Sequence, residues 1–153
     1  MNIDYFKAAE REISSLPLLK RSLPILQSRL ERLIASGAPR EPAGIDLSKP
    51  YVDSNTVNDT LGELCAIAET QAEIRATEDK IQEIEEILEA IPEEQRTVLN
   101  LFYIDNLTAE KIAKRIFVES EKTVYNIRNK GIANYSVLYY GAMARRSEGV
   151  GKK

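Results

Sequence analysis

Three short amphipathic segments follow one another in PEEQRTVLNLFYIDNLTAEKIAKRIFVESEKTVYNIRNKGIANYSVLYY, which covers residues 92–140. The first predicted helix takes Pro92 into its opening turn and ends near Asp105. Thr108 and Ser120 are predicted to cap a second and a third helix, because their hydroxyls accept hydrogen bonds from the free N–H groups of a helix start. The apolar residues predicted to pack the three helices together are Val98, Leu101, Phe102, Ile112, Ala113, Ile116, Val124, Ile127 and Ile132. This order of short helix, turn and polar-faced helix predicts a helix-turn-helix, which an unspecialised bundle has no reason to reproduce.

The third predicted helix carries a polar face opposite its apolar stripe. Amide and charged side chains on such a face suit contacts with base edges and phosphates in the major groove of DNA. Basic residues of the second helix are expected to stay in water and to face the phosphate backbone. The residues predicted to contact DNA are Thr108, Lys111, Lys114, Arg115, Ser120, Glu121, Lys122, Thr123, Tyr125, Asn126, Arg128, Asn129 and Lys130. Double-stranded DNA is therefore the expected partner.

The charged residues are distributed unevenly along the chain, although the formal net charge is only -3. From Lys111 to the C-terminus there are ten basic and three acidic residues, whereas residues 56–91 contain ten acidic and two basic ones. A positive field at one end favours phosphate binding even when the total charge is negative. The C-terminal part is thus the expected DNA-binding part, and the acidic segment is expected to be a solvated helix face that avoids DNA.

A specific resemblance is carried by two runs, RTVLNLFYIDNLTAEKIAKRI and KTVYNIRNKGI. They are similar to the fourth region of bacterial sigma factors, whose helix-turn-helix reads the upstream promoter element. More narrowly, the chain resembles the small late-gene regulators of phages and prophages of Gram-positive bacteria, the ArpU and RinA type. The resemblance covers the last third of the chain well and the rest only in layout. Sigma factors often have Gly in the turn where this chain has Phe117, and the stretch between Val118 and Val124 is one residue longer than their usual spacing.

The resemblance implies a sequence-specific DNA-binding transcriptional regulator that activates phage late genes together with host RNA polymerase. In that family the module also contacts the polymerase, so we expect Glu93, Glu94 and Arg96 to form this contact. An alternative from another class is a small-terminase-like DNA packaging protein, in which a helix-turn-helix binds viral DNA and coiled helices build a ring. Domain order argues against it, because such proteins commonly place the DNA module first. A third reading is a structural coiled-coil adaptor whose last helices bind protein.

Two heptad-like seams precede the helix-turn-helix. The first consists of Leu19, Leu23, Leu26, Leu30 and Leu33, and the second of Ile67, Ile74, Ile81 and Leu88 together with Thr70, Thr77, Ile84 and Ile91. Narrow stripes of this kind are typical of coiled coils. The seams can pair with each other as an antiparallel hairpin or with another molecule as a homo-oligomer, and the sequence leaves both open.

Several smaller features of this region also carry expectations. A short helix is predicted from Asp4 to about Ser14, and Pro24 is expected to kink or divide the helix that follows, because proline cannot donate the intrahelical hydrogen bond. Residues 36–55 are rich in Gly, Pro, Ser and Asp and are predicted to form a mobile linker. Cys65 is the only cysteine and is expected to be a small core residue.

Together these features predict an all-α protein, in which N-terminal helices and a coiled-coil-like hairpin precede the helix-turn-helix. The expected segments are N-terminal helices at 1–35, a flexible linker at 36–55, a long acidic helix at 56–91 that pairs with the N-terminal helices, the DNA-binding domain at 92–143 and a basic flexible tail at 144–153.

The composition argues against several other classes of protein. The chain contains no histidine, only one cysteine and no glycine-rich phosphate loop, so we expect neither an enzyme nor a bound metal or cofactor. No apolar run reaches the roughly 20 residues that a membrane-spanning helix needs, and the N-terminus lacks a signal-peptide pattern. We therefore expect a cytoplasmic protein without a membrane partner.

Overall fold

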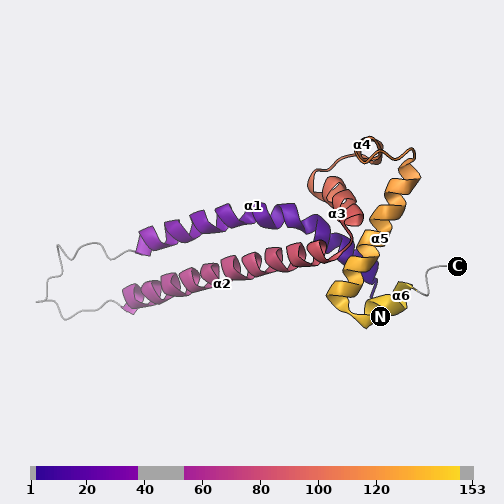
Figure 1. The fold of residues 1–153 in the computed structure, drawn as a ribbon. Helices are drawn as coiled ribbons and strands as arrows, with labels where there is room; N and C mark the ends of the chain where they lie inside the picture. The colour runs from indigo at the N-terminus through magenta and orange to yellow at the C-terminus, as the bar shows by residue number, and fades with distance from the viewer. Residues whose placement is uncertain (1–2, 38–53, 149–153) are drawn as a thin grey trace, which may run out of the picture. The chain divides into compact units, whose positions relative to one another are not determined.

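A computed structural model describes residues 3–37 and 54–148, and within these residues the fold is all-α, as predicted. The elements in chain order are α1 (Tyr5–Gly37), α2 (Ser54–Ala90), α3 (Glu93–Leu99), the π-helical turn η1 (Asn100–Ile104), α4 (Ala109–Arg115), α5 (Glu121–Tyr140) and α6 (Ala142–Glu148) (Figure 1). The predicted linker lies outside the described residues, apart from its two ends, which are helical.

The chain divides into two compact units. Unit 1 contains residues 1–19 and 80–153, and unit 2 contains residues 20–79. The division runs through both long helices, so that the first part of α1 and the last part of α2 belong to the same unit as α3 to α6. All residues predicted to contact DNA lie in unit 1.

Helix α1 runs without interruption through Pro17 and Pro24. The separate short helix expected near the N-terminus is the first part of this longer helix. Of the two effects expected of Pro24, a kink or a division, the division does not occur. Each proline removes one main-chain hydrogen bond. Burial of Ala9, Ile13 and Leu16 stabilises the helix on the N-terminal side of both prolines.

Unit 2 contains two helical segments, which run side by side in opposite directions in Figure 1. Leu23, Leu26 and the later seam leucines of α1 are half-buried, and Thr70 of α2 is buried. The hydroxyl of Thr70 donates a hydrogen bond of 2.8 Å to the carbonyl of Ala66, which satisfies this polar group inside the seam. Cys65 is exposed, so the prediction that it is a core residue is wrong. It lies two residues before Ile67 in the heptad, outside the narrow stripe that is covered.

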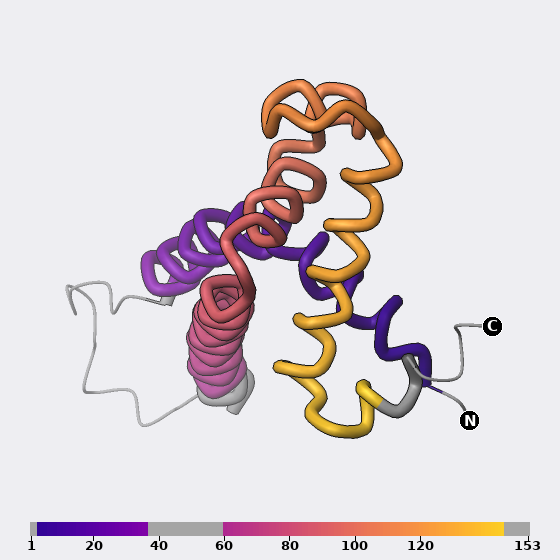
Figure 2. The backbone as a smooth tube through the Cα atoms, turned by 45° about the vertical axis from the view of Figure 1, so that its right-hand side comes forward, coloured from indigo at the N-terminus to yellow at the C-terminus, as the bar shows by residue number. Residues whose placement is uncertain are grey.

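The core of unit 1 is formed by side chains from α1 to α6 and from η1. Its fully buried residues include Ile13 and Leu16 of α1, Ile84 of α2 and Tyr135 of α5. Figure 2 shows α5 running past α3, and the two helices pack directly on each other. The last part of α5, which contains Tyr135, therefore belongs to the core of unit 1. The first part of α5 carries the residues predicted to contact DNA.

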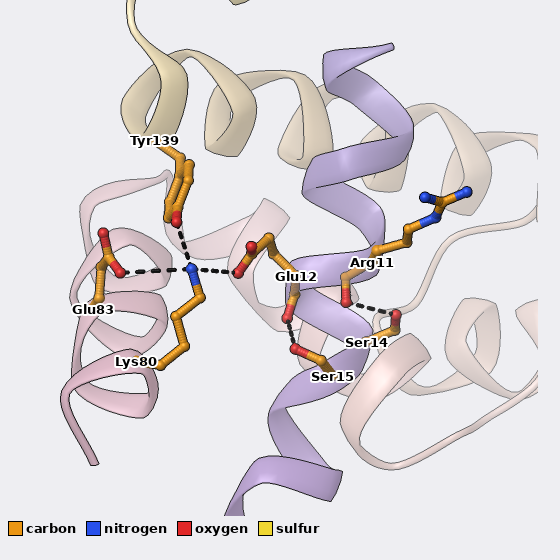
Figure 3. Close-up of polar contacts among 7 residues, drawn as sticks. All are labelled: Arg11, Glu12, Ser14, Ser15, Lys80, Glu83 and Tyr139. Carbon is orange, nitrogen blue, oxygen red and sulfur yellow. Dashed lines mark hydrogen bonds and ion pairs between the residues drawn. The ribbon is translucent and has the colours of Figure 1, made fainter. Parts of the chain in front are cut away.

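A half-buried polar cluster joins α1, α2 and α5 within unit 1 (Figure 3). The ammonium group of Lys80 on α2 lies 2.9 Å from Oε2 of Glu12 on α1 and 3.6 Å from Oε2 of Glu83. It also donates a hydrogen bond to the hydroxyl of Tyr139 on α5 and lies over the Tyr139 ring, 4.4 Å from its centroid. Burial alone lowers the pKa of Lys80, but the hydrogen bonds to Tyr139 and Glu12 outweigh it and raise the pKa above its ordinary value. The cluster thus holds a charged lysine at the meeting point of α1, α2 and α5.

Beyond Tyr140 the chain reverses at Gly141, which has a φ of 75°. Residues 142–148 then form α6, which packs on α5 and buries Ala144 completely. The flexible tail expected from residue 144 is therefore helical up to Glu148. The physical reason is a tertiary contact, because Ala144 gains an apolar site that a short polar sequence does not reveal. Residues 149–153 lie outside the described residues.

Candidate nucleic-acid interface

The segment from α3 to α5 has its own apolar cluster. The buried members are Val98, Leu101, Ala109, Ile112, Ala113, Val124 and Ile127, with Phe102, Leu107, Ile116 and Val118 packed against them. These residues include every apolar position predicted to pack the three helices, except Ile132, which is buried as well. The expected apolar packing is therefore confirmed at the level of individual residues.

Both predicted caps are present. The hydroxyl of Thr108 accepts a hydrogen bond from the backbone N–H of Lys111 at 3.4 Å, and the hydroxyl of Ser120 accepts one from the N–H of Lys122 at 3.1 Å. Thr108 and Ser120 have extended backbones, as N-cap residues do. Their side-chain oxygens are thus already engaged in starting α4 and α5, although both residues were predicted to contact DNA.

The turn between α4 and α5 contains a residue in the left-handed conformation. Phe117 has a φ of 61°, at the position of the turn where sigma factors often have Gly. The backbone N–H of Val118 donates to the carbonyl of Ala113 at 2.9 Å, which closes the end of α4 in the manner usually associated with glycine. The Phe117 side chain is 92% exposed, so it obtains almost no packing inside the chain.

Four residues project from α5 at helical spacing: Lys122, Tyr125, Asn126 and Asn129. All four are exposed, and we call them the α5 outer face. Val124 and Ile127, between them in sequence, are buried in the apolar cluster. The helix therefore presents amide, phenol and ammonium groups along one side and is anchored by the other. Glu121, Thr123 and Lys130 are exposed beside this face.

The basic residues of α4 are exposed next to the same turn. Lys111 and Arg115 make no side-chain hydrogen bond or ion pair within the described part of the chain. Lys114 lies 3.5 Å from Oε1 of Glu110, in an ion pair whose side chains are 78% and 68% exposed. A pair this exposed contributes little to stability and leaves the ammonium group accessible. The structure thus presents three cations on α4.

Arg128 differs from the other predicted DNA contacts, because its guanidinium group packs against two aromatic rings of the same domain. The Cζ atom lies 4.9 Å from the ring centroids of both Phe102 on η1 and Tyr125 on α5. The two rings contact each other in an edge arrangement at 6.2 Å. Arg128 is half-buried as a result. Its side chain therefore connects η1 with α5 through cation–π contacts.

The guanidinium group of Arg128 also reaches its sequence neighbour. Its Nε and Nη2 groups donate hydrogen bonds of 3.2 and 2.9 Å to Oδ1 of Asn129. Asn126, one turn earlier, has no side-chain hydrogen bond within the described residues. The two asparagines of the α5 outer face thus differ in whether their amide groups are fixed.

The residues predicted to contact RNA polymerase lie at the start of α3. Glu93 and Glu94 are exposed in its first turn, where their charge complements the helix dipole. Arg96 is half-buried, and its Nη1 donates a hydrogen bond of 3.3 Å to the carbonyl of Glu89 near the end of α2. Arg96 therefore serves to satisfy a carbonyl at a helix end.

Sequence reasoning missed several side-chain contacts that join η1 and α5 to other elements of unit 1. Phe102 was assigned only to the apolar stripe, and Tyr103 was assigned no role. The Tyr103 hydroxyl donates to Oε2 of Glu10 on α1 at 3.1 Å, and burial, followed by the charge of Glu10, raises the pKa of Tyr103 above its ordinary value. Asn134 of α5 donates to Gln95 of α3 at 2.7 Å. These partners are far apart in sequence, so no local signal identifies them.

In the part of the chain that the structure describes, no cluster of three or more His, Cys, Asp or Glu side chains is arranged to hold a metal ion. Among the same residues no helix combines the length and the apolar character needed to cross a membrane. The chain matches no family model, no curated protein and no solved structure.

Proposed function

We propose that this chain is a sequence-specific DNA-binding transcriptional regulator, in which α5 enters the major groove of duplex DNA. The α5 outer face is the observation that carries the proposal. Lys122, Tyr125, Asn126 and Asn129 are exposed on one side of a helix whose other side is anchored in an apolar core. Such a helix has the side chains and the rigidity to read base edges.

The charge distribution around the face supports the same partner. Between residues 110 and 130 there are six basic and three acidic residues. Lys111, Lys114 and Arg115 expose their charges on α4, the helix that crosses the phosphate backbone in a helix-turn-helix complex. These cations attract the phosphates of any duplex, and the α5 outer face supplies the preference for particular base pairs.

The proposal extends to transcription through the sequence resemblance to the fourth region of sigma factors. A regulator of that type acts in the cytoplasm beside host RNA polymerase and activates late genes of a phage. The exposed carboxylates of Glu93 and Glu94 at the start of α3 are the candidates for the polymerase contact. Arg96 stays a candidate beside them, although its Nη1 group donates a hydrogen bond to the carbonyl of Glu89 near the end of α2.

The deciding experiment is selection of bound duplexes from a random-sequence DNA pool with the full-length protein. We expect a defined motif to be enriched. Replacing Lys111, Lys114 and Arg115 together by alanine is expected to reduce binding of both selected and unselected duplexes. If the full-length protein retains no duplex DNA at low salt, the proposal is wrong, and an adaptor that binds protein takes its place.

A further inference from the structure

The position of Arg128 is set by contacts within the protein. Its guanidinium group lies 4.9 Å from the ring centroids of Phe102 and Tyr125, which come from different helices. Cation–π contact with two rings restricts the orientation of the group. The group is therefore oriented before DNA binds.

This orientation fixes the side-chain amide of Asn129. Arginine has only N–H donors, so the atom of Asn129 that faces Arg128 must be the carbonyl oxygen. Two donors of the guanidinium group, at 3.2 and 2.9 Å, are bonded to this oxygen. The amide NH2 group is then the part of Asn129 left for a ligand, and Asn129 is exposed on the α5 outer face.

Asn126 provides the contrast on the same face. Its amide has no hydrogen-bond partner among the described residues, so it can present its oxygen and its NH2 group together. An asparagine of that kind makes the paired contact with N6 and N7 of adenine. Asn129 cannot make that contact while Arg128 occupies its oxygen.

We infer that Asn129 reads its base as a donor only and thereby selects guanine, with Arg128 as the positioning residue. The inference rests on the proposed function, since it concerns the same DNA surface. Guanine is the base whose major-groove edge offers acceptors alone, N7 and O6. Adenine adds a donor beside its acceptor, thymine adds a methyl group, and cytosine offers a donor. Arg128 was predicted as a DNA contact, and the geometry assigns it to the orientation of its neighbour.

Three full-length variants test the inference by selection from random duplex DNA. The wild type is expected to prefer guanine at one position by about tenfold over adenine, which is the typical size of one good base contact. Asn129→Asp replaces the donor by acceptors and is expected to convert this position to cytosine, whose N4 group donates. Arg128→Lys keeps the charge but loses the two-donor fork, so adenine and guanine are expected to become nearly equal there.

Asn126→Asp is the matched control, because it makes the same charge change on the same face. It is expected to alter a different position and to leave the guanine preference intact. Thermal unfolding of Arg128→Lys shows whether the loss of packing against the two rings has disturbed the fold. If the fold is disturbed, the test rests on Asn129→Asp, because Asn129 is exposed and its substitution removes no buried contact.

The outcomes separate the inference from the proposed function. If the wild type enriches a motif but no position responds to Asn129→Asp, or the responding position is adenine in the wild type, the inference is wrong and the proposed function stands. If the wild type enriches no motif, both are overturned.

Discussion

Gly131 on α5 lies directly against Leu99 on α3: a Cβ atom on Gly131 would lie 3.0 Å from Cδ1 of Leu99 and 3.2 Å from its Cγ. Leu99 is fully buried and has little room to withdraw. The Cβ atom of Gln95 would lie 3.2 Å away on the same side. The missing side chain of Gly131 therefore sets how closely α5 approaches α3.

Gly131→Ala is expected to lower the free energy of unfolding by about 1–3 kcal/mol, because the added methyl group overpacks the contact with Leu99. Gly62→Ala on α2 is the control, because a Cβ at Gly62 meets nothing within 4 Å. It should instead stabilise the protein by about 0.5–1 kcal/mol through helix propensity. Urea unfolding of both variants measures the difference, and equal stability would show that α5 does not need this close approach.

Substitution of Phe117 is expected to change the free energy of unfolding in the opposite direction, towards greater stability. Its φ of 61° and its 92% exposure mean that the chain carries the strain of a left-handed residue without a packing gain. Phe117→Gly is expected to raise the free energy of unfolding by up to about 1 kcal/mol, since relief of the strain exceeds the entropy that glycine loses on folding. Phe117→Ala keeps the Cβ atom and should stay close to the wild type. A destabilised glycine variant in thermal melts would show that the ring contributes to the fold.

Alkaline pH is expected to destabilise unit 1. The pKa of Lys80 is raised chiefly by its bonds to Tyr139 and Glu12, which outweigh burial, and burial raises the pKa of Tyr103. Both groups hold their protons more tightly in the folded state, so their stabilisation is complete below the unfolded values and is lost as the pH rises above about 10. Unfolding free energy measured from pH 7 to 11 should fall only at the upper end. Tyr103→Phe should make that fall shallower, and an unchanged slope would remove Tyr103 from the explanation.

Helical periodicity and capping chemistry predicted much of unit 1. Thr108 and Ser120 cap the helices expected of them, and Ile112, Val124 and Ile127 are buried as their spacing requires. Local rules failed where a tertiary contact decided the outcome. Burial of the first part of α1 outweighs Pro24, and burial of Ala144 creates α6.

The candidate site shows the same limit. Exposure of Lys122, Asn126 and Asn129 follows from their position on an amphipathic helix, and sequence periodicity identifies them. The orientation of Arg128 does not follow from periodicity, because it depends on Phe102 in another helix. Tertiary packing therefore decides which of the residues predicted to contact DNA have a side chain that is not engaged within the protein.

The cations of α4 are expected to act through phosphate attraction. Arg115→Ala should weaken binding to all duplexes and reduce the slope of log K against log salt by about 0.9, the value for one lost phosphate contact. Lys114→Ala should have a smaller effect, because Glu110 lies 3.5 Å from its ammonium group. Asn126→Ala is the control, expected to relax sequence preference and leave the slope unchanged. Titrations by fluorescence anisotropy at several salt concentrations measure these slopes, and an unchanged slope for Arg115→Ala excludes it from the interface.

A transcription assay distinguishes an activator from a packaging protein. With purified host polymerase, the protein should raise transcription from a promoter that carries its selected motif. Reversing Glu93 and Glu94 to lysine should lower this activation, whereas DNA affinity should stay equal or rise slightly, because added positive charge favours phosphate binding.

If the two residues serve only the dipole of α3, each reversal costs about 0.3–1 kcal/mol of stability and reduces binding and activation together. Gln substitutions at the same positions separate loss of the acidic contact from introduced repulsion. Tight DNA binding without any change in transcript yield contradicts the regulator reading, and ring-shaped oligomers in electron micrographs would then favour packaging, since coiled helices build the ring in that class of protein.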